Sequence, residues 1–282
     1  MASLPYTLFE FWLPTTADNV NTSPFYLALH EALRRRNMLL ADICPPGDET
    51  ARRVLEDYGA MFVAGEAIMP PPTCVFTSEE LVQQFQAAAE PAGATIDGAR
   101  IELQPAAMDA LLKALRKAND EGLDITPRDG AEAARRSYAD TLRLWNTRFL
   151  PALDHWQKQG RLSPQQVVRL QGLAVDRQVR EVLELEKQGI FFSKDFSKSV
   201  LYSIAAPGTS QHVAMLAFDV IEFQNARVRE ILGEHGWFQT VLSDLPHFTF
   251  LGLERSELTR RGLKPVEVAG QTFWIPDVEN SE

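Results

Sequence analysis

Cysteine is scarce in this chain: Cys44 and Cys74 are the only two among 282 residues. Two cysteines are too few for a disulfide framework, and their spacing is not that of metal ligands. We interpret them as two separate thiols, with a single bridge as the alternative. The hydrophobic residues, 45% of the chain, are sufficient for an ordinary globular core.

Long apolar runs are also missing. No stretch of about 18 consecutive apolar residues exists, so the sequence predicts no membrane span. The N-terminus, MASLPYTLFEFWLPTT, has no basic region and carries Glu10 within its apolar part, which makes it a poor signal peptide. The location therefore stays open: periplasmic or extracellular if a leader has been removed, and cytoplasmic otherwise.

The chain lacks an excess of positive charge. Its net charge of −10 argues against nucleic acid as the main partner, because phosphate contacts need basic patches. The longest basic run, RRR at 34–36, lies in a helical pattern and is interpreted as a solvated helix face. Nothing in the pattern indicates an oligomeric state.

Helical patterns and short strand-like segments alternate without regular βαβ units, which favours an α+β fold. Helices are expected at 23–43, 48–58, 77–91, 105–122, 131–158, 163–189 and 223–235. Strands are expected at 60–63, 99–104, 123–130, 198–205, 247–253 and 271–276. A composition break at 90–98, EPAGATIDG, suggests a mostly helical N-terminal extension (1–98) and a second domain (99–282).

The segment GTSQHVAMLAFDV (208–220) places His212 and Asp219 in an apolar run, where each needs a partner. Both side chains are good zinc ligands. Residues seven apart point to opposite faces of a straight strand, so a shared ligand requires a helix, bulge or turn near 214–216. A buried His–Asp hydrogen bond without metal is the alternative.

The segment SDLPHFTF (243–250) adds Asp244 and His247, just before a strand-like run. With His212 and Asp219, His247 completes the three protein ligands of a catalytic zinc site. Asp244 is then placed to act as the general base. The alternative is that Asp244 caps a turn and that His247 is incidental.

These residues resemble the zinc D-Ala-D-Ala metallopeptidases, which include vancomycin-resistance dipeptidases and carboxypeptidases, phage endolysin peptidases and the hedgehog-like fold. The family pattern S-x-H-x-x-G-x-A-x-D, followed by [E/D]-x-x-H, is matched over 99–282 by Ser210, His212, Ala217, Asp219, Asp244 and His247. The resemblance implies one zinc ion on His212, Asp219 and His247, Asp244 as base, and Ser210 in contact with substrate.

The same family carries an arginine that binds substrate. In ARRSYADTLRLW (134–145), Arg136 matches it best, with Ser137 and Tyr138 beside it, while Arg128 and Arg135 are rivals. Tyr138 is expected to contact the substrate as well. A fixed guanidinium suits carboxylate binding and oxyanion stabilisation. Without the resemblance, these arginines would be assigned to a charged helix face.

Two other residues bear on the cleft. Trp237 follows a glycine and is a candidate for its wall, with a core tryptophan as the alternative. Met215 stands where the family has glycine, so it must adopt a strained backbone conformation or avoid it.

The expected function is therefore a zinc-dependent peptidase of the D-Ala-D-Ala carboxypeptidase kind, a cell-wall hydrolase acting on peptidoglycan peptides or small D-Ala-D-Ala peptides. Alternatives are an endolysin-type endopeptidase, a non-catalytic zinc- or cell-wall-binding protein on the same fold, and a metal-free protein in which the motifs occur by chance.

Overall fold

The computed structural model describes residues 22–45 and 47–279. Its α-helices are α1 (Pro24–Arg35), α2 (Leu40–Ile43), α3 (Glu49–Tyr58), α4 (Glu79–Ala88), α5 (Pro105–Asp120), α6 (Tyr138–Lys158), α7 (Pro164–Gln171), α8 (Val175–Glu186) and α9 (Ala226–Glu234). In this part of the chain, no helix is both long enough and apolar enough to cross a membrane.

The strands form three small antiparallel sheets. They are β1 (Ala92–Ile96) with β2 (Ala99–Leu103); β3 (Ala217–Asp219), β5 (His247–Phe250) and β4 (Trp237–Phe238) in the order β3-β5-β4; and β6 (Leu263–Val268) with β7 (Gln271–Pro276). Helices mixed with small antiparallel sheets confirm the α+β class.

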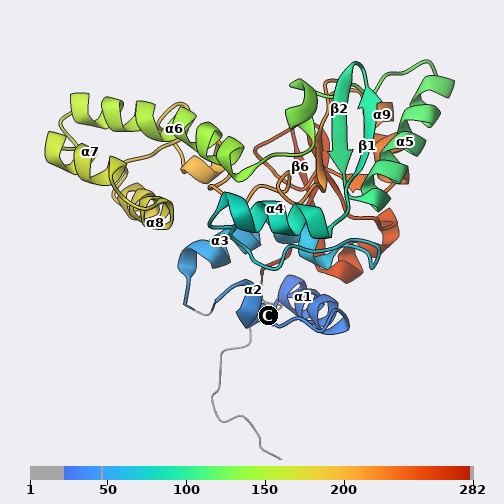
Figure 1. Cartoon of the computed structure of the whole chain (residues 1–282), viewed down its shortest axis with the longest axis horizontal. Coiled ribbons are helices and arrows are strands. Elements are labelled where there is room, and N and C mark those ends of the chain that lie inside the picture. Colours follow the sequence, from blue (N-terminus) through green and yellow to red (C-terminus); the bar gives the residue numbers. More distant parts are fainter. Residues whose placement is uncertain (1–21, 46, 280–282) are drawn as a thin grey trace, which may run out of the picture.

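The hydrophobic residues form two main cores. The larger core unites α1, β2, β3 and β5, with Phe25, Leu103, Phe218 and Phe248 among its buried members. The second core belongs to residues 145–206, the helical arm, and is built around Trp145, Phe149 and Phe192. Figure 1 shows α6, α7 and α8 projecting away from the sheets. The arm therefore has an interior of its own.

The boundary expected near residue 98 falls inside the β1–β2 hairpin, where Ile96 pairs with Ala99. Residues before and after this turn share the larger core, so no separate N-terminal core is formed by the described residues up to 98. Asp97 and Gly98 both have positive φ, 45° and 76°. The composition break thus marks an Asp-Gly hairpin turn, a recognised strand-connecting signal.

Several local predictions are corrected. Residues 60–63 lie in a 3₁₀ helix, η1 (Gly59–Val63), and 198–205 contains another, η3 (Val200–Tyr202). Residues 123–130 contribute only an isolated bridge between Pro127 and Val220 before η2 (Gly130–Ala133). The expected helix at 163–189 breaks at Gly172, where α7 ends. Periodicity alone does not distinguish short apolar segments such as 60–63 from strands.

Other predictions are confirmed. The strands at 99–104 and 271–276 and the helices at 105–122 and 223–235 are present as β2, β7, α5 and α9. Ser163 caps α7 in a capping box with Gln166. At α4 the N-cap is Ser78, whose hydroxyl accepts from the Leu81 amide.

Candidate metal centre

Strand pairing brings two of the expected ligands together. Asp219 ends β3 and lies directly opposite His247, which begins β5. Because neighbouring antiparallel strands hold opposed side chains close, this register fixes both residues relative to each other. The third residue, His212, precedes β3 in a tight turn.

This turn explains how His212 and Asp219, seven residues apart in the sequence, can point to the same place. Three successive i→i+3 hydrogen bonds join Val213, Ala214 and Met215 to the carbonyl groups of Ser210, Gln211 and His212. The turn folds His212 back beside β3, so His212 and Asp219 face the same point. This is the turn near 214–216 that a shared ligand requires.

The three side chains converge tightly. His212 Nε2 lies 3.1 Å from His247 Nδ1 and 3.3 Å from Asp219 Oδ1, and His247 Nδ1 lies 3.1 Å from Asp219 Oδ1. All three residues are buried, at 1%, 6% and 4% exposure for His212, Asp219 and His247. Tetrahedral zinc with bonds of about 2.0–2.1 Å requires ligand atoms about 3.3 Å apart. The triangle therefore has the size of a zinc site.

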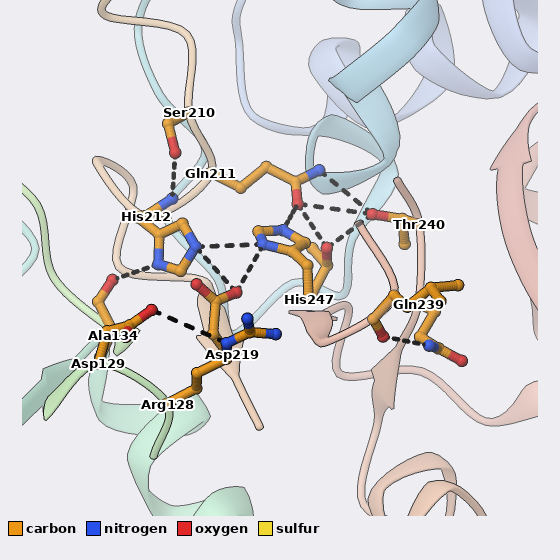
Figure 2. A network of polar contacts seen from close by, with 12 residues as sticks. Arg128, Asp129, Ala134, Ser210, Gln211, His212, Asp219, Gln239, Thr240 and His247 are labelled. Atoms are coloured by element: carbon orange, nitrogen blue, oxygen red, sulfur yellow. Dashed lines mark hydrogen bonds and ion pairs between the residues drawn. The ribbon is translucent and has the colours of Figure 1, made fainter. Parts of the chain in front are cut away.

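Each ligand is oriented from behind by an outer partner, as Figure 2 shows for the two histidines. His212 Nδ1 donates to the Ala134 carbonyl oxygen at 2.8 Å, and His247 Nε2 donates to Gln211 Oε1 at 2.8 Å. Arg136 Nη2 donates to Asp219 Oδ2 at 2.8 Å. Metal-binding residues typically have such outer partners.

These partners favour a metal ion over a simple hydrogen bond among the three side chains. Because the outer nitrogens of His212 and His247 are donors, their inner nitrogens carry lone pairs when the rings are neutral. Three acceptor atoms then face one another at 3.1–3.3 Å, which is unfavourable without a cation between them. One proton satisfies a single contact at a time, whereas a metal ion satisfies all three.

The electrostatics favour the ligand forms. Burial, helped by the charge of Arg136, lowers the pKa of His212 to about 4, which keeps its imidazole neutral near pH 7. Burial alone would raise the pKa of Asp219, but the positive charge and the hydrogen bonds that His212 and His247 offer when protonated outweigh it and hold that pKa well below its usual value. A neutral imidazole and an ionised carboxylate are the forms that bind metal.

The residues His212, Asp219 and His247 line a cavity of about 530 Å³. Its volume is in the range of small-molecule sites, about 300–1,000 Å³. Asp244 and Ser210 line it as well. The centre is therefore buried on its protein side and accessible from the cavity.

Asp244 is the unpaired acid of this cavity. In the part of the chain that the structure describes, no hydrogen bond or ion pair engages its carboxylate. The residue borders the cavity solvent, yet the crowding of protein around its carboxyl group, with the charge of Asp219, raises its pKa. An unpaired carboxyl group of raised pKa beside the ligands is suited to proton transfer.

The three candidate arginines have different settings. Arg136 lines the cavity and is held by Asp219 and the Glu132 carbonyl oxygen, and its Nη1 has no partner among the described residues. Arg128 also lines the cavity, with Nε 3.9 Å from Asp129 Oδ2. Arg135 is bound to Glu102 and Gln86 and does not line the cavity, so it is excluded as the substrate arginine.

Two expected substrate contacts are corrected. Tyr138 is buried at the start of α6 and lines a different cavity, beside Val179. Trp237 is 0% exposed and packs between Phe218 and Phe250, away from the metal cavity. Both aromatic side chains serve the core, because an apolar ring on an inner strand or helix face is stabilised by burial. Ser210, by contrast, borders the cavity, and its hydroxyl lies 3.4 Å from the His212 amide.

Met215, at the glycine position of the sequence pattern, has a left-handed backbone conformation. Its φ is +55°, in the left-handed region that glycine adopts freely, and its side chain is fully buried. The surrounding bonds hold it there: its amide donates to the His212 carbonyl oxygen, and its carbonyl oxygen accepts from the Gln104 amide. Methionine thus adopts the strained conformation rather than avoiding it.

Sequence reasoning missed Gln211. Its Oε1 accepts from His247 and also from Thr249, while its Nε2 donates to the Tyr58 carbonyl oxygen at 2.8 Å. Gln211 is 1% exposed, so its amide orientation is fixed by these partners. A polar amide directly before His212 in an apolar run was the available signal, because a buried amide needs partners.

Comparison of the chain with family models, curated proteins and solved structures finds no match.

Proposed function

We propose that this protein is a zinc-dependent peptidase that hydrolyses a peptide bond next to a D-amino acid, as in D-Ala-D-Ala carboxypeptidases. The observation that carries the proposal is the convergence of three lone-pair atoms, 3.1–3.3 Å apart, beside the unpaired carboxylate of Asp244. Three protein ligands with an open side are typical of catalytic rather than structural zinc.

The chain's own groups account for the proton and charge movements. Zinc held by His212, Asp219 and His247 would supply Lewis acidity that polarises a carbonyl group and acidifies water. Asp244 takes the proton of the attacking water and passes it to the leaving amine. Arg136, through its free Nη1, stabilises the negative charge that develops on the scissile carbonyl oxygen.

The peptide substrate rests on the motif resemblance. Ser210, His212, Ala217, Asp219, Asp244 and His247 match the pattern of the zinc D-Ala-D-Ala metallopeptidases in order and spacing. The small antiparallel sheet β3-β5-β4, which carries Asp219 and His247, is compatible with the hedgehog-like fold of that family. The cavity leaves room for more than a dipeptide, so peptidoglycan peptides are included among the substrates.

The test combines zinc content with turnover of N-acetyl-D-Ala-D-Ala. We expect one zinc ion per chain and release of D-alanine, with Asp244→Asn retaining zinc but losing at least about 100-fold in kcat. Asn keeps the size of Asp and removes its basicity, so a fully active Asp244→Asn variant would disprove the base assignment. One bound zinc without turnover of any D-Ala-D-Ala peptide would instead favour a non-catalytic zinc-binding protein.

A further inference from the structure

The metal cavity has two walls of different origin. One wall belongs to the body, by which we mean the described residues outside the helical arm. The body supplies the candidate metal ligands, Asp244, Arg128 and Arg136. The other comes from the helical arm, which contributes Arg148 on α6 and the segment 202–205. The arm's own hydrophobic core holds this second wall independently of the metal ligands.

Arg148 is the charged group of the arm wall, and its side chain is held in place without being neutralised. Nε donates to Ser203 Oγ at 2.7 Å, and Nη1 donates to Thr147 Oγ1 at 2.9 Å. Among the described residues, no carboxylate forms an ion pair with Arg148, and Nη2 has no partner. The guanidinium is therefore oriented and still able to bind an anion.

Arg148 differs from exposed arginines such as Arg116 in that it lines the metal cavity, and it differs from many other arginines in having no carboxylate partner among the described residues. Acidic residues outnumber Lys and Arg by 38 to 28, and other surface arginines such as Arg143, Arg169 and Arg227 are paired with carboxylates. An unpaired arginine in a cleft attracts anions more strongly than one on a flat surface, because low-dielectric walls focus its field. Carboxylate is the anion that a peptide substrate can offer, and guanidinium binds it through paired N–H groups.

We infer that Arg148 is a specificity-determining residue that binds a carboxylate of the substrate, so that the arm selects acidic peptides for the metal centre. This inference rests on the proposed function for the identity of the peptide. The exposed ring of Tyr202, with Ile204 beside it, supplies apolar surface on the same wall for the part of the substrate near that carboxylate. The carboxylate is either the C-terminal one or one farther along the peptide.

Three peptides distinguish these sources. N-acetyl-D-Ala-D-Ala has only the C-terminal carboxylate, N-succinyl-D-Ala-D-Ala amide has only a distal one, and N-acetyl-D-Ala-D-Ala amide has neither. The full chain is assayed with zinc for kcat/KM and without zinc for Kd by calorimetry. For the peptide whose carboxylate Arg148 binds, we expect Arg148→Gln to lower kcat/KM and to raise Kd by at least about tenfold each. Both values should stay the same for the neutral N-acetyl-D-Ala-D-Ala amide.

The controls separate charge from structure. Arg148→Lys should recover part of the lost affinity and kcat/KM, because lysine restores the positive charge but lacks the planar guanidinium with its paired N–H donors. Arg116 is an exposed arginine of α5 that has no partner in the described part of the chain, so Arg116→Gln should change neither kcat/KM nor Kd. Zinc content and melting temperature should match wild type in all variants, since Arg148 contacts no ligand.

The inference is overturned if Arg148→Gln changes kcat/KM and Kd equally for all three peptides or for none of them. In that case, release of D-alanine by the wild-type protein would still support the proposed function. The reverse result, carboxylate-selective binding that depends on Arg148 without turnover of any peptide, would keep the inference and reject the peptidase. If wild type binds no carboxylate peptide at all, the inference also fails.

Discussion

Asp219 and His247 lie opposite each other on β3 and β5, and Asp219 Oδ1 is 3.1 Å from His247 Nδ1. Two of the three candidate ligands are thus placed by backbone register, a feature that resists distortion more than a loop does. Only His212 depends on a turn, and its Nδ1 bond to the Ala134 carbonyl oxygen holds that ring. The centre is therefore preformed.

Zinc should stabilise the folded chain measurably. Binding only to the native state at a free zinc concentration of 100 times Kd adds about 2.7 kcal/mol to the free energy of unfolding. For a chain of this size, we expect the melting temperature to rise by roughly 5 °C or more, as followed by calorimetry. His212→Ala should abolish the rise, whereas Asp244→Asn should retain it. Equal rises in wild type and His212→Ala would place the zinc elsewhere.

Gln211 should tune zinc affinity without touching the metal. Gln211→Met removes the acceptor of the His247 Nε2 proton, and loss of such a partner costs about 10–100-fold in metal affinity. Competition with a chromophoric chelator measures this loss. Gln239→Met is the matched control, because Gln239 is also buried but its amide bonds to Leu245 and Gln271 instead. An unchanged affinity in Gln211→Met would show that His247 is oriented by packing alone.

The zinc-free protein should lose stability as the pH falls. The pKa of His212 is lowered to about 4 in the folded chain, so the unfolded chain binds more protons at mildly acidic pH. The stabilisation is fully present above the unfolded pKa of about 6.5 and is lost as pH falls from there toward 4, by about 3 kcal/mol. Urea unfolding at several pH values measures it.

Two carboxyl groups of the site also affect how stability depends on pH. The lowered pKa of Asp219 affects stability only below its unfolded value of about 4, beneath this window. The raised pKa of Asp244 acts with opposite sign, because the folded chain then holds the proton at higher pH. Asp244→Asn should therefore steepen the loss on acidification, and His212→Asn should flatten it. A flat profile in wild type would contradict a neutral buried His212.

Met215 should tolerate leucine better than isoleucine. Leucine has nearly the same volume as methionine, so Met215→Leu should cost less than about 1.5 kcal/mol in the free energy of unfolding. Isoleucine has the volume of leucine but branches at Cβ, and a β-branched residue at φ +55° is a genuine outlier. We expect Met215→Ile to cost about 1–3 kcal/mol more than Met215→Leu in denaturant unfolding. Equal costs would mean that the turn changes conformation when substituted.

The sequence predicted the centre better than its surroundings. His212, Asp219 and His247 were predictable because polar groups in apolar runs need partners, and because the three together match a known zinc-ligand pattern in type and order. Tyr138 and Trp237 were misplaced because aromatic rings are equally suited to a cleft and a core, and only tertiary packing decides between them. Arg135 was excluded as the substrate arginine only by its distant partners, Gln86 and Glu102.

The helical arm, residues 145–206, is joined to the rest of the chain by the first part of α6 and by residues 207–209. Beside these two connections, the Arg136 amide donates to the His212 carbonyl oxygen at 3.4 Å. Both connections of the arm therefore begin beside the candidate metal centre. The sequence of the arm can diverge, lengthen or be exchanged by design without moving a ligand. Under the two proposals, the residues of the arm that select the substrate could then change independently of the metal ligands that carry out hydrolysis.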